Sequence, residues 1–217
     1  MNIRFKNARI LPFQTEEATI IEGELWVQDD RIAFLGDPKD RELPVFDREI
    51  DCKGNLILPG FKNAHTHTAM TFLRSYADDL PLQEWLYNRV FPMEAKLTPE
   101  RVYWLSRLAI LEYLTSGITG IMEMYMEPES IARACSETGM RLVQVGACNN
   151  FSQSPELVAH YFETLNGKDP LTSYRLGFHA EYTTSLELMK QLSKLANRRK
   201  LPVFVHNSET KKEVDEC

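Results

Sequence analysis

Alternating hydrophobic and polar positions predict short β-strands in the first 56 residues. One run contains Ile3, Phe5, Ala8 and Ile10, and two more cover residues 24–27 and 32–35, on either side of the polar pair Asp29-Asp30. Such runs separated by polar turns are typical of antiparallel hairpins. With a further short run at residues 48–51, the pattern predicts a small β layer over residues 1–56.

The rhythm changes from residue 57, where strand-like runs alternate with helical patterns. The first strand is expected in the apolar segment from Leu56 to Phe61, and the later ones at residues 118–125, 140–148, 174–182 and 201–206. Thr98 before Pro99 and Ser185 before an apolar periodic segment are helix start signals. Strands that alternate with helices predict parallel βαβ units and an α/β fold.

The spacing of about thirty residues suits an eight-unit (β/α) barrel, in which ~250 residues give roughly 31 per unit, although a doubly wound sheet has a similar rhythm. The end of the sequence favours the barrel with about its first five βα units present. Thr210-Lys211-Lys212-Glu213 is a capping box that opens a helix, and the sequence stops at Cys217. We therefore expect residues 57–217 to be the front part of a longer barrel protein.

Composition excludes several classes of function. The chain has 25 basic and 31 acidic residues, a net charge of −6, and no apolar run long enough for a membrane helix, so neither nucleic acid nor a membrane is an expected partner. The N-terminus carries no signal-peptide pattern, and the four cysteines are scattered without a C-x-x-C pair. Reduced thiols and a cytoplasmic location are expected.

Histidines at strand ends carry the strongest chemical signal. His65 and His67 stand two residues apart after the first barrel strand, so their imidazoles are expected on one face. His179 and His206 each close a later strand, and Glu209 follows His206 by three residues. Imidazoles at the carboxyl ends of barrel strands are typical of a zinc-type site, although each histidine alone could be an ordinary polar residue of the rim.

The motifs together resemble the metal-dependent amidohydrolase superfamily, in particular its branch of S-adenosylhomocysteine/5′-methylthioadenosine deaminases and chlorohydrolase-like enzymes. The resemblance covers nearly the whole chain. It rests on residues 58–67 with the His-x-His pair, on 77–86 with Trp85, on 91–100 with Glu94, on 179–183 and on 206–210.

That resemblance implies a (β/α)8 TIM-type barrel with a small β-sandwich domain, of which residues 1–56 would form a portion. It implies that His65, His67 and His206 are metal ligands, Glu209 the proton shuttle, His179 a substrate contact and Glu94 a partner of ribose hydroxyls. Trp85 lies in a substrate-side loop of the family or packs in the core below it. In the family a further catalytic histidine follows the sixth strand, and an aspartate ligand follows the eighth.

The implied activity is hydrolytic deamination of an aminated purine, a 5′-modified adenosine in the first instance. Because the fourth strand ends in His179 rather than in a metal-bridging lysine, one divalent ion is expected, Zn²⁺ before Fe²⁺ or Mn²⁺. Val145 and the loop 149–155 provide no arginine where adenosylhomocysteine-type enzymes carry one, which leaves the 5′ substituent open. The alternatives are another ring substrate (guanine, cytosine or an s-triazine) and a non-catalytic fragment that pairs with a second half or survives in a homo-oligomer.

Overall fold

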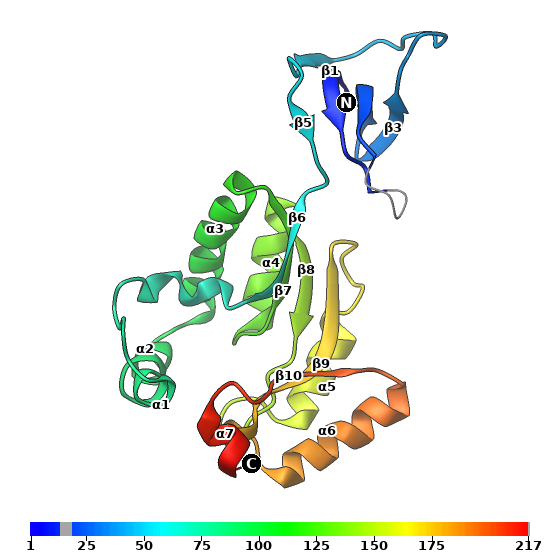
Figure 1. Ribbon diagram of the computed structural model, residues 1–217. Coiled ribbons are helices and arrows are strands. Elements are labelled where there is room, and N and C mark those ends of the chain that lie inside the picture. The colour runs from blue at the N-terminus through cyan, green and yellow to red at the C-terminus, as the bar shows by residue number, and fades with distance from the viewer. Residues whose placement is uncertain (14–18, 217) are drawn as a thin grey trace. The chain divides into compact units, whose positions relative to one another are not determined.

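Each of two compact units, divided after Gly60, contains its own sheet in the computed structural model, which describes residues 1–13 and 19–216 (Figure 1). The first unit has the strand order β3-β2-β1-β4, and β5 also pairs with β1. Strands β1 (Asn2–Ile10), β2 (Ile21–Gln28) and β3 (Arg31–Gly36) are antiparallel neighbours, so the predicted hairpins are confirmed. Strands β4 (Arg48–Asp51) and β5 (Leu56–Ile57) run parallel to β1.

A close approach of backbone and a buried polar cluster fix the pairing in this unit. A Cβ atom added to Gly23 would lie 2.2 Å from the carbonyl oxygen of Gly36, so only glycine fits between β2 and β3. The Glu24 carboxylate accepts hydrogen bonds from Arg4 Nε at 2.8 Å and from Trp26 Nε1 at 2.7 Å. The strands described within residues 1–60 form a single sheet, and the β-sandwich, which needs a second layer, remains a prediction.

The second unit begins at Phe61 and is built on a parallel sheet with the sequential order β10-β9-β8-β7-β6. Its strands are β6 (Phe61–Thr66), β7 (Ile118–Glu123), β8 (Arg141–Val145), β9 (Thr172–Ala180) and β10 (Val203–His206). The first of them differs from the prediction, which placed it at residues 56–61. Leu56 and Ile57 instead pair with β1, and the strand of the parallel sheet starts after Pro59-Gly60 and contains His65.

The helices begin where the sequence signals them. Helix α3 (Pro99–Thr115) has Thr98 as its N-cap, α6 (Leu186–Arg199) has Ser185, and the backbone amide of Thr210 donates to Glu213 before α7 (Lys211–Glu216). The remaining helical elements are η1 (Thr68–Leu73), α1 (Leu82–Trp85), η2 (Leu86–Val90), α2 (Phe91–Glu94), α4 (Pro128–Thr138), α5 (Pro155–Leu165) and η3 (Glu181–Thr183). None of the helices in the described residues has the length and apolar character that a membrane crossing requires.

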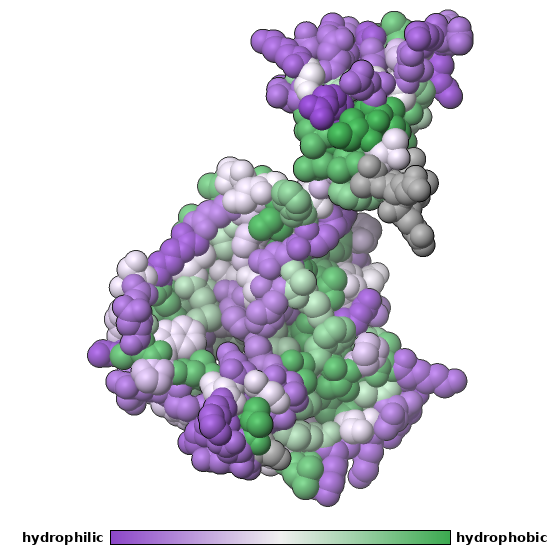
Figure 2. Space-filling model, viewed as in Figure 1, coloured by the Kyte–Doolittle hydropathy of each residue, from purple (hydrophilic) through white to green (hydrophobic). Residues whose placement is uncertain are grey.

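The packing distinguishes an incomplete barrel from a doubly wound sheet. On one face of the sheet, Ile121 and Leu142 pack with side chains of α3 and α4, and Tyr174 and Leu176 pack with side chains of α5 and α6. The other face carries an apolar cluster of its own, composed of Met122, Met124, Val145, Ala147 and Phe204. Figure 2 shows hydrophobic atoms gathered over β8 and β9. Helices on one face and sequential strand order are features of a (β/α) barrel, so the structure supports the barrel reading.

Candidate metal centre and substrate cavity

Strand β6 delivers two histidines to the carboxyl edge of the parallel sheet. His65 is within the strand, and His67 directly follows it as the N-cap of η1. Their rings lie 4.8 Å apart between centroids and nearly perpendicular to one another. The spacing of two residues therefore brings both imidazoles to one region, as the sequence predicted.

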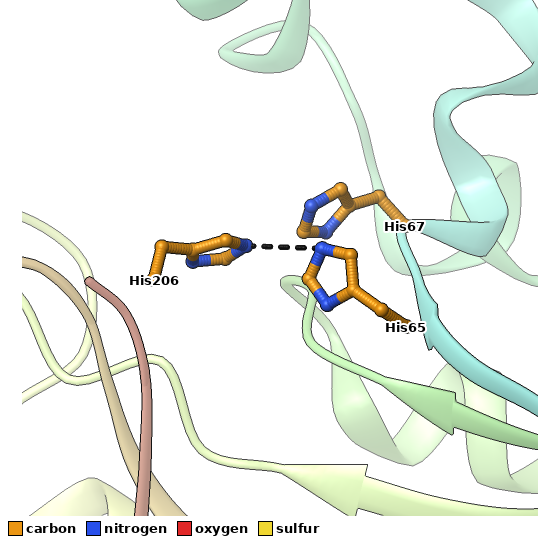
Figure 3. Close-up of side chains that lie close together, drawn as sticks. All are labelled: His65, His67 and His206. Atoms are coloured by element: carbon orange, nitrogen blue, oxygen red, sulfur yellow. Dashed lines mark hydrogen bonds between the residues drawn. The ribbon is translucent and has the colours of Figure 1, made fainter. Parts of the chain in front are cut away.

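His206 joins them from the other edge of the sheet, at the end of β10 (Figure 3). Its Nε2 atom lies 3.2 Å from Nε2 of His65, and its ring centroid lies 5.3 Å from that of His67. One ligand nitrogen from each of the three histidines lies within 4.8 Å of the others. Curvature of the five-stranded sheet is thus sufficient to bring side chains separated by 141 positions together.

Backbone carbonyls orient two of these rings. Nδ1 of His67 lies 2.6 Å from the carbonyl oxygen of Met124, and Nδ1 of His206 lies 2.7 Å from that of His179. A carbonyl oxygen only accepts, so each Nδ1 must carry the proton and donate it. Nε2 of His67 and His206 is then left with its lone pair free, which is the state that a metal ligand needs.

Burial favours the neutral form of two of these histidines, His65 and His67. Burial lowers the pKa of His67 to about 4, an effect that the hydrogen bond to Met124 opposes and that His206 and His65 reinforce. The pKa of His65 is also lowered, first by burial and then by His206, while Glu209 acts in the opposite direction. Neutral imidazoles at pH 7 are competent ligands.

The donor set fits a single zinc-type ion. Two imidazole nitrogens at ~2.1 Å from a tetrahedral zinc lie about 3.4 Å apart. The Nε2 atoms of His65 and His206 are separated by 3.2 Å, which is close to this value. Three nitrogen donors are also the usual protein set of a catalytic zinc site, which keeps a further position open.

A cavity of about 120 Å³ adjoins the three histidines. Two of its walls are apolar, one from Leu82 to Phe91 and the other with Met126, Ala147 and Phe151. Six of the seven residues that the sequence singled out line it: Trp85, Glu94, His67, His179, His206 and Glu209. The seventh, His65, contacts His206.

Two of these residues are oriented by neighbouring side chains. Glu94 accepts a hydrogen bond from the hydroxyl of Tyr125 at 2.7 Å, and burial raises the pKa of Glu94 while that hydrogen bond lowers it. His179 Nδ1 lies 2.7 Å from Oγ1 of Thr183, and burial lowers the pKa of His179 to about 4.

Glu209 and Trp85 differ in how firmly they are packed. Glu209 is exposed at the cavity wall. Trp85 is half-buried, packs with the cluster of Leu73, Leu86 and Val90, and also lines the cavity. The two alternatives for Trp85, core packing and substrate side, are thus compatible.

Residues at the end of β7 were missed by the sequence analysis. Met124 provides the carbonyl that orients His67, and Tyr125 holds Glu94. The sequence contains the signal, because Met124 and Tyr125 directly follow Glu123, the last residue of a barrel strand, just as His67 follows β6. Tyr182, which lines the cavity beside Glu209, was missed as well.

Comparison with known proteins gives a consistent result. The amidohydrolase family model matches residues 56–217. A 5-methylthioadenosine/S-adenosylhomocysteine deaminase of Syntrophomonas wolfei is 40% identical over 224 residues, covering 100% of this chain and 51% of that protein. The protein of the same name from Pyrococcus furiosus is 37% identical over 208 residues, covering 93% of this chain and 49% of its own length.

A solved structure agrees with these relatives. The crystal structure of an adenosine deaminase from Xanthomonas campestris with bound zinc superposes with a TM-score of 0.88 at 29% sequence identity, covering 99% of this chain and 51% of the other. The chain thus spans about half the length of the relatives it matches. Because the family model matches about three quarters of the residues of this chain, the chain belongs to the amidohydrolase family.

Proposed function

We propose that the protein to which this chain belongs is a metal-dependent hydrolytic deaminase of a 5′-modified adenosine, which takes up water and releases ammonia. The observation that carries the proposal is the convergence of His65, His67 and His206 beside a cavity that also contains Glu94 and Glu209. Relatives that carry the name of such deaminases at 40% and 37% identity support the same reaction.

The three histidines would hold one divalent ion, for which zinc is the first choice because of the all-nitrogen donor set. Such an ion lowers the pKa of water toward ~7 and so supplies a nucleophile at neutral pH. The residues of the chain itself provide the proton transfers and the binding contacts.

Glu209 is the proposed proton shuttle. Its carboxylate lines the cavity beside His206, where it can accept the proton of the attacking water. It would pass this proton to the ring nitrogen next to the carbon that carries the amino group. The water oxygen would bond to that carbon and give a tetrahedral intermediate. The second proton of the same water, lost from the hydroxyl of the intermediate, would go to the amino group, and the carbon–nitrogen bond would break to give ammonia and the oxo purine.

Glu94, His179 and Trp85 are the proposed binding residues. Glu94 is held by Tyr125 and would accept hydrogen bonds from ribose hydroxyls. The His179 ring lies 5.2 Å from that of His206, between centroids, and would contact the purine. Trp85 lies on the apolar wall, where an aromatic surface favours a flat ring.

The test is Glu209→Gln in the full-length gene product. We expect deamination of methylthioadenosine to fall by about 10²–10⁴-fold with zinc content unchanged, because the amide cannot accept and return a proton. Glu187→Gln, at an exposed glutamate of α6, is the matched control and should leave turnover unchanged. Parent-level turnover in Glu209→Gln would refute the assignment of the shuttle.

Substrate class needs a second measurement. A nucleoside offers ribose hydroxyls to Glu94, whereas guanine, cytosine or an s-triazine does not. Turnover of a free base or triazine, with none of adenosine or methylthioadenosine, would replace the nucleoside in this proposal.

A further inference from the structure

A buried carboxylate, that of Glu123, is hydrogen-bonded to the residue that follows His67. Glu123 is the last residue of β7, and its side chain is fully excluded from solvent. Glu123 lies two residues after Ile121 on β7 and therefore faces the same layer, between the sheet and helices α3 and α4, where Ile121, Leu142 and Ile131 pack. An acid in such a layer is costly to bury unless a specific contact compensates for the loss of hydration.

That contact is made to the residue that follows His67. The Glu123 Oε2 atom accepts a hydrogen bond from the backbone amide of Thr68 at 2.8 Å. Thr68 is the first residue of η1, so its amide is among those that a helix leaves without an internal partner. Thr68 is itself 2% exposed, which means that water cannot replace Glu123 in this role.

Two further hydrogen bonds connect the same pair of segments. The amide of Met124 donates to the carbonyl of Thr66 at 3.2 Å, and Nδ1 of His67 donates to the carbonyl of Met124 at 2.6 Å. Residues 123–124 therefore hold residues 66, 67 and 68 in succession. The backbone on both sides of His67 is fixed, as well as its ring.

We propose that Glu123 is a positioning residue of the metal centre, which holds the backbone at Thr68 so that the His67 ring meets Met124 with Nδ1 and the ion with Nε2. The inference rests on the proposed function insofar as His67 is a ligand. Removal of the carboxyl group frees the amide of Thr68 and allows the turn after β6 to shift, which misdirects the ring.

The state of the carboxyl group suggests the conservative replacement. Burial raises the pKa of Glu123 to about 8, and hydrogen bonding from Thr68 opposes this shift. At neutral pH the group is therefore largely the uncharged acid. Glutamine has the same length and an acceptor oxygen for the Thr68 amide, so Glu123→Gln should preserve the contact.

Zinc affinity in the full-length gene product, measured by competition with a chromophoric chelator, tests the inference. We expect Glu123→Ala to bind zinc about 10- to 100-fold more weakly than the parent, the range found when an outer partner of a metal ligand is removed. Glu123→Gln should stay within about 3-fold of the parent. Glu123→Asp, which retains the acid but is one methylene shorter, should lose about 5-fold or more and provides the measurement if the alanine variant fails to fold.

Met140→Ala is the matched control. Met140 is fully buried in the same layer, and none of the hydrogen bonds described above joins it to residues 66–68. It should unfold at a lower temperature in the metal-free form but keep parent affinity. Equal losses of affinity in Met140→Ala and Glu123→Asp, or parent affinity in both Glu123→Ala and Glu123→Asp, would overturn the inference. A parent that binds no zinc, or His67→Ala with parent affinity, would overturn the metal centre itself and this inference with it.

Discussion

His206 donates its Nδ1 proton to the backbone carbonyl of His179 at 2.7 Å, which directs its Nε2 atom to within 3.2 Å of Nε2 of His65. The hydrogen bond connects the ends of adjacent strands β9 and β10, whereas the second distance spans the sheet from β10 to β6. His206 is therefore the residue that joins the two edges of the curved sheet at the metal centre.

His206→Ala should lower zinc affinity by about 100-fold or more, because the ion would lose a ligand and His65 and His67 alone form an incomplete set. His160→Ala, at an exposed histidine on α5, should bind zinc as the parent does. Chelator competition at pH 7 distinguishes the two variants. Equal affinity for the parent and His206→Ala would mean that the ion is held elsewhere.

Tyr125→Phe tests how Glu94 is held. The phenol donates to Glu94 at 2.7 Å, and without it the carboxylate can rotate away from the ribose site. We expect KM for adenosine to rise about 10-fold, the scale of one hydrogen bond to a charged group, with a smaller change in kcat. The expected signature is a loss of discrimination between adenosine and 2′,3′-dideoxyadenosine. If the ratio of their kcat/KM values is unchanged, Tyr125 has no role in ribose recognition.

The order of β-strands and the positions of the histidines could be predicted from sequence because parallel strands share one carboxyl edge. The rule located His65, His67, His179 and His206 without any knowledge of the helices between them. The prediction was wrong for Leu56 and Ile57, which it placed in the parallel sheet and which pair with β1 instead, because their hydrophobicity suits either sheet.

Contacts made by backbone atoms and by distant side chains were beyond such a rule. Met124 acts through its carbonyl oxygen, whose direction no side-chain pattern reports. Tyr125 and Glu94 lie 31 positions apart, and only the folded chain brings Glu94, the last residue of α2, to Tyr125, which follows β7. Glu123 resembled one more strand residue until its burial and its bond to Thr68 were known.

Glu123 should also give the metal-free protein a distinctive dependence of stability on pH. Its pKa in the folded state, about 8, lies above the ~4.3 of an unfolded chain, so the folded state binds more protons between these values. The free energy of unfolding contributed by this group therefore falls as pH rises from about 4.5 to 8, by roughly 1 kcal/mol per pH unit. Because other groups titrate in the same window, the informative quantity is the difference between Glu123→Gln and the parent.

Urea unfolding at pH 5, 6, 7 and 8 measures that difference. Glu123→Gln should gain stability relative to the parent at each step upward, whereas Glu187→Gln, on the surface of α6, should follow the parent. A constant difference between Glu123→Gln and the parent across the range would show that Glu123 does not titrate in this window.

The charge of the cavity predicts which 5′ substituent is preferred. Among the described residues that line it, Glu94 and Glu209 carry carboxylates and none is a lysine or arginine. The rest of the lining described combines apolar side chains, including Met126, Ala147 and Phe151, with histidines and neutral polar residues. A methylthio group can be buried there at little cost, whereas the amino-acid end of adenosylhomocysteine brings a carboxylate without a cationic partner. We expect kcat/KM to favour methylthioadenosine, by about 10-fold or more.

Phe151→Arg should weaken the preference for methylthioadenosine over adenosylhomocysteine. Phe151 is 63% exposed at the cavity wall, so an arginine there can be accommodated without disturbing the core and can pair with a carboxylate in two hydrogen bonds. We expect kcat/KM for adenosylhomocysteine to rise about 10-fold relative to that for methylthioadenosine. The change should come from a lower KM for adenosylhomocysteine. Phe151→Gln removes the same ring without adding charge and should leave the ratio near that of the parent. If both variants change the ratio equally, loss of the phenyl ring is responsible, and the absence of a cation in the described wall does not set the preference.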